Sequence, residues 1–468
     1  MENKRIEHDS MGEVAVPADR YWGAQTQRSL ENFPIGDRRM PTEIIRAFGY
    51  LKRAAAEANR ALCPARLSAE QAAAISAAAD EVIAGALDGH FPLSVFQTGS
   101  GTQTNMNVNE VIANRANVMA AGKDSPADIP AVPRLCHPND HVNMSQSSND
   151  TFPTVMHVAA KLAIRDRLLP ALDRMIASFA ALEATYGDIV KCGRTHLQDA
   201  TPIRFGQEIS GWRGMLETAR RQIVAASEGL SHLALGGTAV GTGLNAPAGF
   251  DTLVAERLSA LTGETFVTDP NKFHALTAKD ELAFAHGALK ALAADLMKIA
   301  NDVRWLASGP RLGLGEITIP ENEPGSSIMP GKVNPTQCEA VTMVAVQVMA
   351  NDVAVGLSAS QGNFQLNVFM PVCIDNFLSS VRLLSDAVAS FEARCVSGIR
   401  PVQEKMEENL HRSLMTVTAL TPHIGYENAA RVAKLAHAEN ITLREACLRL
   451  GYLSAEEFDR LYHPERMV

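Results

Sequence analysis

The sequence lacks the cysteine spacing of a metal-binding or disulfide-rich protein. Its seven cysteines are odd in number and widely scattered, and no two are spaced as Cys-x-x-Cys. Neither a zinc site nor an iron–sulfur cluster is indicated, so we predict a chain without metal or cofactor. Scattered thiols of this kind are typical of buried, unpaired cysteines in a reducing compartment.

Long apolar runs are also missing. No segment approaches the roughly eighteen consecutive apolar residues of a membrane-spanning helix. The first nine residues have neither the apolar core of a secretory signal nor the Arg- and Ser-rich, acid-poor composition of a transit peptide. These absences predict a cytoplasmic protein without a membrane partner.

Positive charge is in deficit, because 43 Lys and Arg residues stand against 52 Asp and Glu, for a formal net charge of -9 at pH 7. That balance argues against a general nucleic-acid or membrane-surface binder. Any site for an anionic substrate must therefore be basic locally. The candidate basic residues for such a site are Arg134, Arg194, His196 and Lys332.

What the chain does have is helical periodicity. At 468 residues it is too long for one simple core. Apolar residues at steps of three and four predict long helices over 153–186, 204–231, 276–308, 336–360 and 366–396. Pro170 should kink or break the first of these. Shorter helices are predicted over 41–61, 68–86, 426–438 and 442–450.

These patterns predict a mainly all-α fold in three parts. A mixed, mostly helical N-terminal domain (1–140) and a small C-terminal helical domain (397–468) would flank an elongated central bundle of long helices (141–396). Several of the long helices carry apolar residues on more than one face, as Leu282 to Leu292 does. Such faces are usually buried against other copies of a chain, so we expect self-association.

One loop carries more chemistry than any other segment. It reads Gly325-Ser-Ser-Ile-Met-Pro-Gly-Lys-Val-Asn-Pro335, and its glycines and prolines cannot continue a helix or a strand. Asn334 and Pro335 then indicate a helix start, with Asn as the cap. Hydroxyls, a lysine and a helix N-terminus together favour the binding of an anion and the stabilisation of developing negative charge.

Two glycine-rich stretches invite a nucleotide interpretation that the residues do not support. Gly236 to Gly243 has no Lys-Ser/Thr pair and so is not a P-loop, and neither it nor Gly99 to Gly101 follows a convincing strand. Close backbone approach at a turn, with amides free to bind a carboxylate, explains these glycines better.

The loop from Gly325 to Pro335 resembles the signature loop of the fumarase/aspartase superfamily. Three further blocks support the resemblance: Thr98-Gly-Ser-Gly-Thr-Gln-Thr-Asn-Met-Asn107, Ser145-Gln-Ser-Ser-Asn-Asp150 and Gly193-Arg-Thr-His-Leu-Gln-Asp-Ala200. The opening Asp9-Ser-Met-Gly and Tyr21-Trp-Gly-Ala-Gln-Thr-Gln-Arg28 are similar to the start of the same family. The resemblance is strongest to the iron-independent, class II fumarate hydratases, which are lyases of the tricarboxylic acid cycle.

The resemblance implies reversible hydration of fumarate to (S)-malate by general acid/base catalysis. A proton must leave a carbon next to a carboxylate, which gives an aci-carboxylate with extra negative charge. By resemblance, Ser326 is the base, Lys332 and backbone amides stabilise its alkoxide, and His196 with Glu339 handles the water. We expect the loop to close like a lid.

Substrate binding and assembly are implied in the same way. The substrate-binding residues by resemblance are neutral donors or cations, as two carboxylates require: Ser100, Thr102, Ser147, Ser148, Asn149, Thr195, Ser327, Lys332 and Asn334. A second anion site is implied near the surface, at Arg134, His137, Asn139 and Asp140, with His141 where some relatives have Asp. The family assembles as a homotetramer and builds each site from three subunits.

Several alternatives remain open. Taken alone, Ser145 to Asp150 is also typical of a plain N-cap cluster, and the second anion site of a polar loop without a ligand. The runner-up enzyme is aspartate ammonia-lyase, although Ser148 and Gly331 stand where such enzymes usually have Thr and Ala. Argininosuccinate and adenylosuccinate lyases fit the loop less well. A crystallin-like structural protein on the same scaffold is a further alternative.

Overall fold

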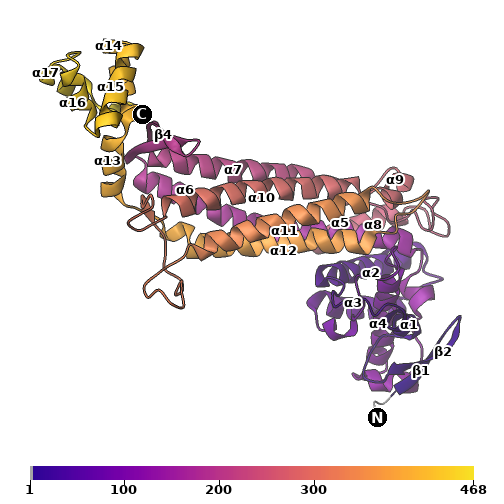
Figure 1. Ribbon diagram of the computed structural model, residues 1–468. Helices are drawn as coiled ribbons and strands as arrows, with labels where there is room; N and C mark the ends of the chain where they lie inside the picture. Colours follow the sequence, from indigo (N-terminus) through magenta and orange to yellow (C-terminus); the bar gives the residue numbers. More distant parts are fainter. Residues whose placement is uncertain (1–3) are drawn as a thin grey trace. The chain divides into compact units, whose positions relative to one another are not determined.

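The computed structural model describes residues 4–468, and most of them are helical (Figure 1). The strands of these residues are short and form two-stranded sheets: β1 (Lys4–Asp9) with β2 (Gly12–Pro17), β3 (Val190–Thr195) with β4 (Gln198–Arg204), β5 (His232–Leu233) with β6 (Val267–Thr268), and β7 (Ile317–Thr318) with β8 (Arg400–Pro401). All pairs are antiparallel except β5 with β6. The mainly all-α prediction is confirmed.

The chain forms two compact units that interleave along the sequence. One consists of Met1–Pro170, Arg221–Ala291 and Val346–Leu384, and the other of Ala171–Arg220, Leu292–Ala345 and Ser385–Val468. The long helices α7 (Phe205–Ser227), α10 (Asp280–Leu306), α11 (Thr336–Ala359) and α12 (Met370–Arg394) have residues in both units. The three-part division with boundaries near 140 and 396 stays a prediction.

The first unit is built around one Ala-rich helix. Besides its parts of the long helices it contains α1 (Ala24–Asn32), α2 (Thr42–Leu62), α3 (Ala69–Ala84), α4 (Thr102–Ala120), α5 (Ser148–Ala163), α8 (Phe250–Thr262) and α9 (Lys272–Thr277). Helix α2 packs on α3, α5 and α8. Its alanines allow close approach, and Phe48 and Leu51 are fully buried. Removing such side chains costs about 2–5 kcal/mol each.

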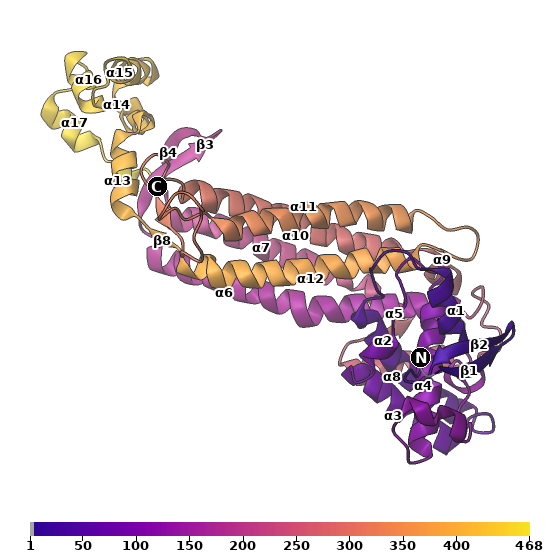
Figure 2. The same ribbon diagram turned by 60° about the horizontal axis from the view of Figure 1, so that its bottom comes forward.

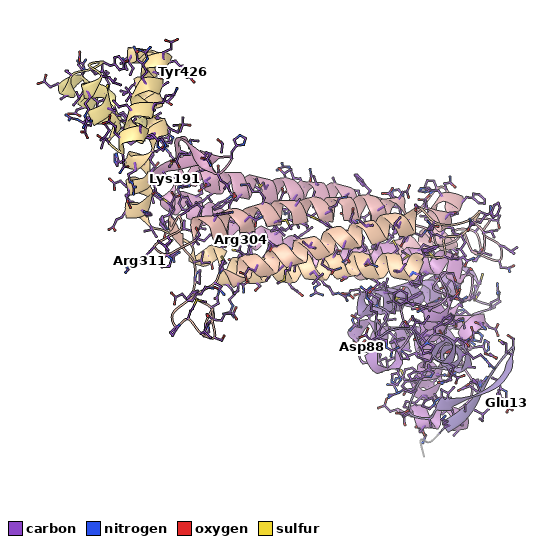
Figure 3. All side chains as sticks on the ribbon, in the orientation of Figure 1. Glu13, Asp88, Lys191, Arg304, Arg311 and Tyr426 are labelled. Atoms are coloured by element: carbon purple, nitrogen blue, oxygen red, sulfur yellow. The ribbon has the colours of Figure 1, made fainter. Side chains whose placement is uncertain are left out.

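The second unit contains α6 (Leu169–Tyr186), nearly all of it, together with the C-terminal helices α13 (Gln403–Arg412), α14 (Thr421–Ile424), α15 (Tyr426–Glu439), α16 (Leu443–Arg449) and α17 (Ala455–Leu461). Val417, Leu420, Val432 and Phe458 belong to a small core that these last helices share. Figure 3 shows the side chains that project outward, and Tyr426 at the start of α15 is one of the most exposed. The remaining short 3-10 or π turns of the chain are η1 (Asp88–His90), η2 (Pro126–Ala131), η3 (Pro138–Val142), η4 (Ile164–Leu168), η5 (Gly229–Ser231), η6 (Val396–Gly398), η7 (Leu414–Leu420) and η8 (Pro464–Arg466).

Most of the predicted helices are confirmed within a few residues. The patterns over 204–231, 276–308, 336–360 and 366–396 correspond to α7, α10, α11 and α12, which lie side by side (Figure 2). The pattern over 153–186 was wrong at its start, because a capping box at Ser147 begins α5 earlier and leaves Pro153 inside the helix. Pro170 was predicted to kink or break this helix, but the backbone stays right-handed helical from Ala163 to Leu169 and the helix is not broken. The π turn η4 replaces the regular α-helical pattern just before Pro170, where the proline ring crowds the backbone.

Among residues 4–468, α11 is the one helix long and apolar enough to cross a membrane by length and composition. Its exposed apolar residues lie three and four positions apart on a single stripe: Met343, Val346, Ala350, Val353 and Leu357. The same helix carries Asp352, whose carboxylate contacts the buried His286 ring at 2.9 Å and the Lys290 ammonium. A stripe with this spacing is typical of packing against another helix.

Candidate active site

The predicted acid residue stands on a strained turn. Strands β3 and β4 form a hairpin in which Thr195 pairs with Gln198, so His196 and Leu197 are its two turn residues. Both have positive φ angles, 58° and 60°, and both are exposed. Two-residue hairpin turns of this kind favour Asn-Gly, and a non-glycine residue there costs about 1–3 kcal/mol. The turn therefore presents the imidazole to solvent in a conformation that non-glycine residues adopt only occasionally.

The 325–335 loop is closed at its base by its own polar groups. The Gly325 amide donates to the Lys332 carbonyl at 2.8 Å, and the Asn334 side chain donates to the Gly325 carbonyl at 2.8 Å. A Cβ on Gly325 would lie 2.6 Å from the Lys332 oxygen, so this position requires glycine. The side-chain N–H of Asn334 thus closes the loop, and among the hydrogen bonds of residues 4–468 no amide of α11 donates to the Asn334 side-chain oxygen, so the predicted cap is not formed.

Ser326 lies inside this loop with its oxygen facing backbone donors. The amides of Ile328 and Met329 donate to Ser326 Oγ at 3.2 and 3.0 Å. Two N–H groups aimed at one oxygen stabilise negative charge on it. Ser327 and Lys332 are exposed on the same loop. The loop therefore presents two hydroxyls and an ammonium, the groups that the sequence singled out.

The predicted pair of His196 and Glu339 is not formed within one chain. Glu339 lies on the first turn of α11 with an exposed side chain. Among the hydrogen bonds and ion pairs of residues 4–468, none joins Glu339 to His196. Both side chains are accessible to a group from outside their own chain.

The hydroxyls of the Thr98–Asn107 block lie at the start of α4, in the first unit. Ser100 Oγ and Thr102 Oγ1 are 2.8 Å apart. The glycines on either side of Ser100 are required by close packing. A Cβ on Gly99 would lie 1.6 Å from the Val368 carbonyl oxygen, and one on Gly101 would lie 2.1 Å from the Phe152 ring. The predicted close backbone approach at these glycines is confirmed.

The Ser145–Asp150 block begins α5. Ser147 is the N-cap, and its oxygen accepts from the Asn149 amide at 3.2 Å, so the plain capping role left open from the sequence does apply to Ser147. Ser148 is different, because its oxygen accepts from the Asn105 side chain at 3.0 Å. The Asn149 side chain donates to the Ala239 carbonyl at 2.8 Å. A cavity of about 320 Å³ lies beside Ser147.

A buried polar network supports Ser148, and sequence reasoning assigned it no role. Asn105 on α4 also donates to Asn143 Oδ1 at 3.1 Å. The same oxygen accepts from Lys52 at 3.1 Å, and Lys52 donates to Gln146 at 2.9 Å. Burial lowers the pKa of the Lys52 ammonium to about 7. A lone lysine among the alanines of α2 was the signal that could have revealed this network.

The glycine-rich stretch 236–243 binds a carboxylate, and that carboxylate belongs to the chain itself. The amides of Gly236 and Thr238 donate to Asp150 Oδ2 at 3.0 and 2.8 Å. Asp150 is fully buried, and burial raises its pKa to about 6 against the lowering effect of these hydrogen bonds. The predicted amides are therefore present, but they are occupied.

The residues of the predicted second anion site lie near one another only in part. His137 is the N-cap of η3 and Asp140 lies within η3, with His137 Nδ1 3.2 Å from Asp140 Oδ2. The backbone N–H of His137 donates to the His141 ring at 2.8 Å. Arg134 is exposed and lies 3.7 Å from a carboxylate oxygen of Glu7. Asn139 lines the cavity beside Ser147.

The expectation of buried thiols is confirmed. All seven cysteines are free, and all but Cys63 are buried. Burial raises the pKa of the Cys136 and Cys373 thiols to about 12, so neither forms a thiolate at neutral pH.

Known proteins resemble this chain over nearly its whole length. A family model described as "Lyase" matches residues 12–350, and one described as "Fumarase C C-terminus" matches residues 417–468. The chain is 61% identical over 464 residues to the class II fumarate hydratase of Bacillus subtilis and 60% identical to that of Helicobacter pylori. These matches cover 99% of this chain and 98% of each relative.

A solved structure agrees with these relatives. The class II fumarase of Schistosoma mansoni is 41% identical, with a TM-score of 0.95 over 99% of each chain. The resemblance first seen in four sequence blocks therefore extends to the whole fold. The chain belongs to the class II fumarate hydratases, and it catalyses the hydration of fumarate to malate.

Proposed function

We propose that Ser326 is the base of this reaction. In the direction from malate to fumarate, a proton leaves the carbon next to a carboxylate, and that carboxylate becomes an aci-carboxylate dianion. A serine can take this proton only if its alkoxide is stabilised. The observation that carries the proposal is the pair of amides, from Ile328 and Met329, that donate to Ser326 Oγ. Lys332 adds a positive charge on the same loop.

His196 and Glu339 are proposed to handle the water on the other carbon. A carboxylate that contacts a histidine orients its ring and raises its basicity. The pair would activate water for addition and, in reverse, protonate the leaving hydroxide. The exposure of both side chains supports a pairing that another copy of the chain completes.

The substrate carboxylates are proposed to bind Ser100, Thr102, Ser147, Ser148, Asn149, Thr195, Ser327, Lys332 and Asn334. Ser148 illustrates how such a donor is aimed. Asn105 donates to the Ser148 oxygen, so the hydroxyl hydrogen of Ser148 remains free to point at an anion. A second anion site is proposed at Arg134, His137, Asn139 and Asp140, where Arg134 and His137 would supply the donors.

We propose that the protein is a homotetramer with shared active sites. The support is the apolar stripe on α11, where Met343, Val353 and Leu357 are each more than 60% exposed in the single chain. An exposed stripe of this length indicates a helix–helix interface between copies. Glu339 lies four residues before Met343, on the same stripe. The interface would therefore bring Glu339 against a neighbouring copy.

Val353→Glu tests the tetramer. It places a charge in the proposed interface, so we expect sedimentation to show smaller species and fumarate hydration to fall with them. Met11→Glu is the matched control, because Met11 is 79% exposed but lies outside the stripe. A tetramer that survives Val353→Glu with normal activity would overturn the proposed interface.

A single assay separates hydration from ammonia addition. The purified protein is incubated with fumarate alone and with fumarate plus ammonium, while the ultraviolet absorbance of the conjugated double bond is followed. Loss of absorbance without ammonium is expected. Loss only with ammonium would indicate an aspartate ammonia-lyase.

The cytoplasm is the proposed location of the protein, and the seven unpaired cysteines support this proposal.

A further inference from the structure

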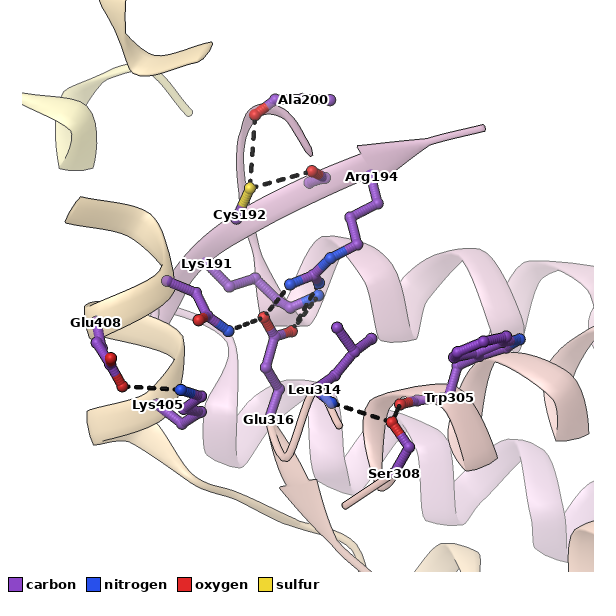
Figure 4. Close-up of polar contacts among 12 residues, drawn as sticks. Lys191, Cys192, Arg194, Ala200, Trp305, Ser308, Leu314, Glu316, Lys405 and Glu408 are labelled. Atoms are coloured by element: carbon purple, nitrogen blue, oxygen red, sulfur yellow. Dashed lines mark hydrogen bonds and ion pairs between the residues drawn. The ribbon is translucent and has the colours of Figure 1, made fainter. Parts of the chain in front are cut away.

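A buried carboxylate lies behind the His196 turn. Glu316 has no exposed surface, and its two oxygens accept hydrogen bonds from both terminal nitrogens of Arg194, at 3.0 and 2.5 Å (Figure 4). The Lys191 ammonium lies 3.2 Å from the same carboxylate, and the Asn409 side chain donates to it at 2.9 Å. We call Glu316, Arg194, Lys191 and Asn409 the Glu316 cluster.

The Glu316 cluster holds two positive charges, on Arg194 and Lys191, and one negative charge, on Glu316, and Glu208 beside Lys191 supplies a second negative charge. Burial by itself would raise the pKa of Glu316, but the hydrogen bonds from Arg194 and the charge of Lys191 lower it below its usual value. Lys191 is also paired with Glu208 at 2.9 Å. A two-pronged contact between a guanidinium and a carboxylate fixes direction as well as distance. Arg194 is therefore held in one orientation.

The Glu316 cluster joins segments that the proposed mechanism uses. Arg194 lies on β3, directly before Thr195, and His196 follows in the turn. Glu316 directly precedes β7, where the chain leaves α10 toward the 325–335 loop, and its backbone is fixed by bonds to Leu306 and Val402. Asn409 lies on α13. The Glu316 carboxylate thus connects the β3–β4 hairpin, through Arg194, to helix α13, through Asn409.

The hairpin needs such an anchor. A register shift between Cys192 and Arg194 places two β4 residues, Ala200 and Thr201, opposite Gly193, which makes a bulge in β4 next to the turn. The turn itself has two non-glycine residues in the left-handed region, a conformation that persists only where the surroundings enforce it. We expect the backbone hydrogen bonds between β3 and β4 to be too few to hold His196 and Leu197 in this conformation without a further contact.

We propose that Glu316 is a positioning residue, which holds the Thr195–His196 turn in its active geometry through Arg194. It does not touch substrate. The proposal rests on the proposed role of His196, because a turn without that role would not affect turnover when it moved.

A double-mutant cycle tests the proposal on the full-length assembled protein. We compare Arg194→Gln, Glu316→Gln and the double variant for kcat and KM with fumarate. Since small misplacements of a catalytic group can cost about 10²-fold, we expect each single variant to lose kcat on that scale with a smaller change in KM. The double variant should lose no more than the worse single variant, because both act on one contact.

Two further measurements separate positioning from general instability. Hydrogen exchange of the 193–200 peptide should speed up in Arg194→Gln, in which the Lys191 ammonium and the Asn409 side chain still contact the buried Glu316 carboxylate. Should Glu316→Gln fail to fold, Arg194→Gln and Asn409→Ala still form a graded pair, with the larger loss of kcat expected for Arg194→Gln. Glu408→Gln is the matched control, because Glu408 pairs with Lys405 on the surface of α13 near the cluster (Figure 4).

The outcomes are distinct. Losses of kcat that multiply in the double variant, or unchanged exchange at 193–200, would overturn the positioning role. Normal turnover in Arg194→Gln would overturn it as well. Failure of the proposed function shows elsewhere, as normal turnover in His196→Asn, whatever the Glu316 variants do.

Discussion

The two units hold their candidate catalytic groups in opposite ways. In the first unit, Ser148 rests on a buried network of amides around Lys52. In the second, His196 and Ser326 stand on turns near solvent. The Ser326 loop is held by backbone bonds and the Asn334 side chain, and the proposed anchor of the His196 turn is the Glu316 cluster. Chemistry on an exposed turn can be removed without unfolding, whereas a buried donor cannot be removed without a cost in stability. Substitutions in the two units should therefore separate activity from stability.

Ser326→Ala should have the largest effect and the cleanest separation. Loss of the base should lower kcat by about 10²–10⁴-fold. The free energy of unfolding should change by no more than ~0.5 kcal/mol, because the Gly325–Lys332 and Asn334–Gly325 bonds remain. Fumarate absorbance and thermal melting measure the two quantities. Ser327→Ala is the control on the same loop, with an effect mainly on KM, and near-normal turnover in Ser326→Ala would remove Ser326 as the base.

His196→Asn should impair the handling of water while the tetramer survives. Asparagine tolerates the left-handed conformation, so the φ of 58° is kept and only the imidazole is lost. We expect kcat to fall about 10²-fold, as for loss of a general acid or base. Leu197→Asn makes the same replacement one residue on, at a φ of 60°, and should leave kcat nearly unchanged. Equal losses in both variants would point to the turn's shape and away from the imidazole.

Asn105→Ala tests the buried arrangement. Ser148 and Asn143 each lose a donor, so the free energy of unfolding should fall by about 1–3 kcal/mol. KM for fumarate should rise at the same time, because the Ser148 hydroxyl is no longer aimed. Asn117→Ala is the control on the same helix, since Asn117 is buried and bonded to the Cys136 backbone. Its stability should fall similarly with KM unchanged, and a KM shift in both variants would deny Asn105 a specific role.

The last test is a pH dependence of stability, which we expect from Lys52. Burial lowers its pKa from 10.5 to about 7, against a weaker raising effect from Asp150. Between those values the unfolded chain holds a proton that the folded chain has released, so stability gains from Lys52 as pH rises from 7 toward 10. The melting temperature of the unmodified protein relative to that of Lys52→Met should therefore increase over this range. A constant difference would mean that Lys52 stays charged in the fold.

Much of the fold was predictable because the long helices are strongly periodic. Four of them were placed within a few residues, whereas α4 and the β1–β2 and β3–β4 hairpins were missed. Helix α4 has buried asparagines on several faces, so its apolar period is weak. The hairpins are short, and the β3–β4 turn contains His-Leu, which carries no turn signal.

The sequence predicted the candidate site residues that stand in recognisable motifs, but not the buried residues that support them. Two segments have residue types that indicate a catalytic or anion-binding site, and they contain Ser326, Lys332 and His196. Lys52, Asn105 and Glu316 act by burial and contact, and each contact joins residues far apart in the sequence. Only the tertiary structure brings such pairs together.

The Asp150 carboxylate accepts the hydrogen bonds of the Gly236 and Thr238 amides, which are therefore not available to a ligand. A phosphate bound there would have to displace the Asp150 carboxylate, which lies in the first turn of α5. The hydrogen bond from the Ser147 amide to Asp150, which is part of the capping box, would be lost as well. The glycine-rich turn resembles a nucleotide-binding site, but it is an intramolecular contact in which the chain supplies both the amide donors and the bound carboxylate. Glycine-rich motifs in other proteins deserve the same check for a tethered occupant before a ligand is assigned to them.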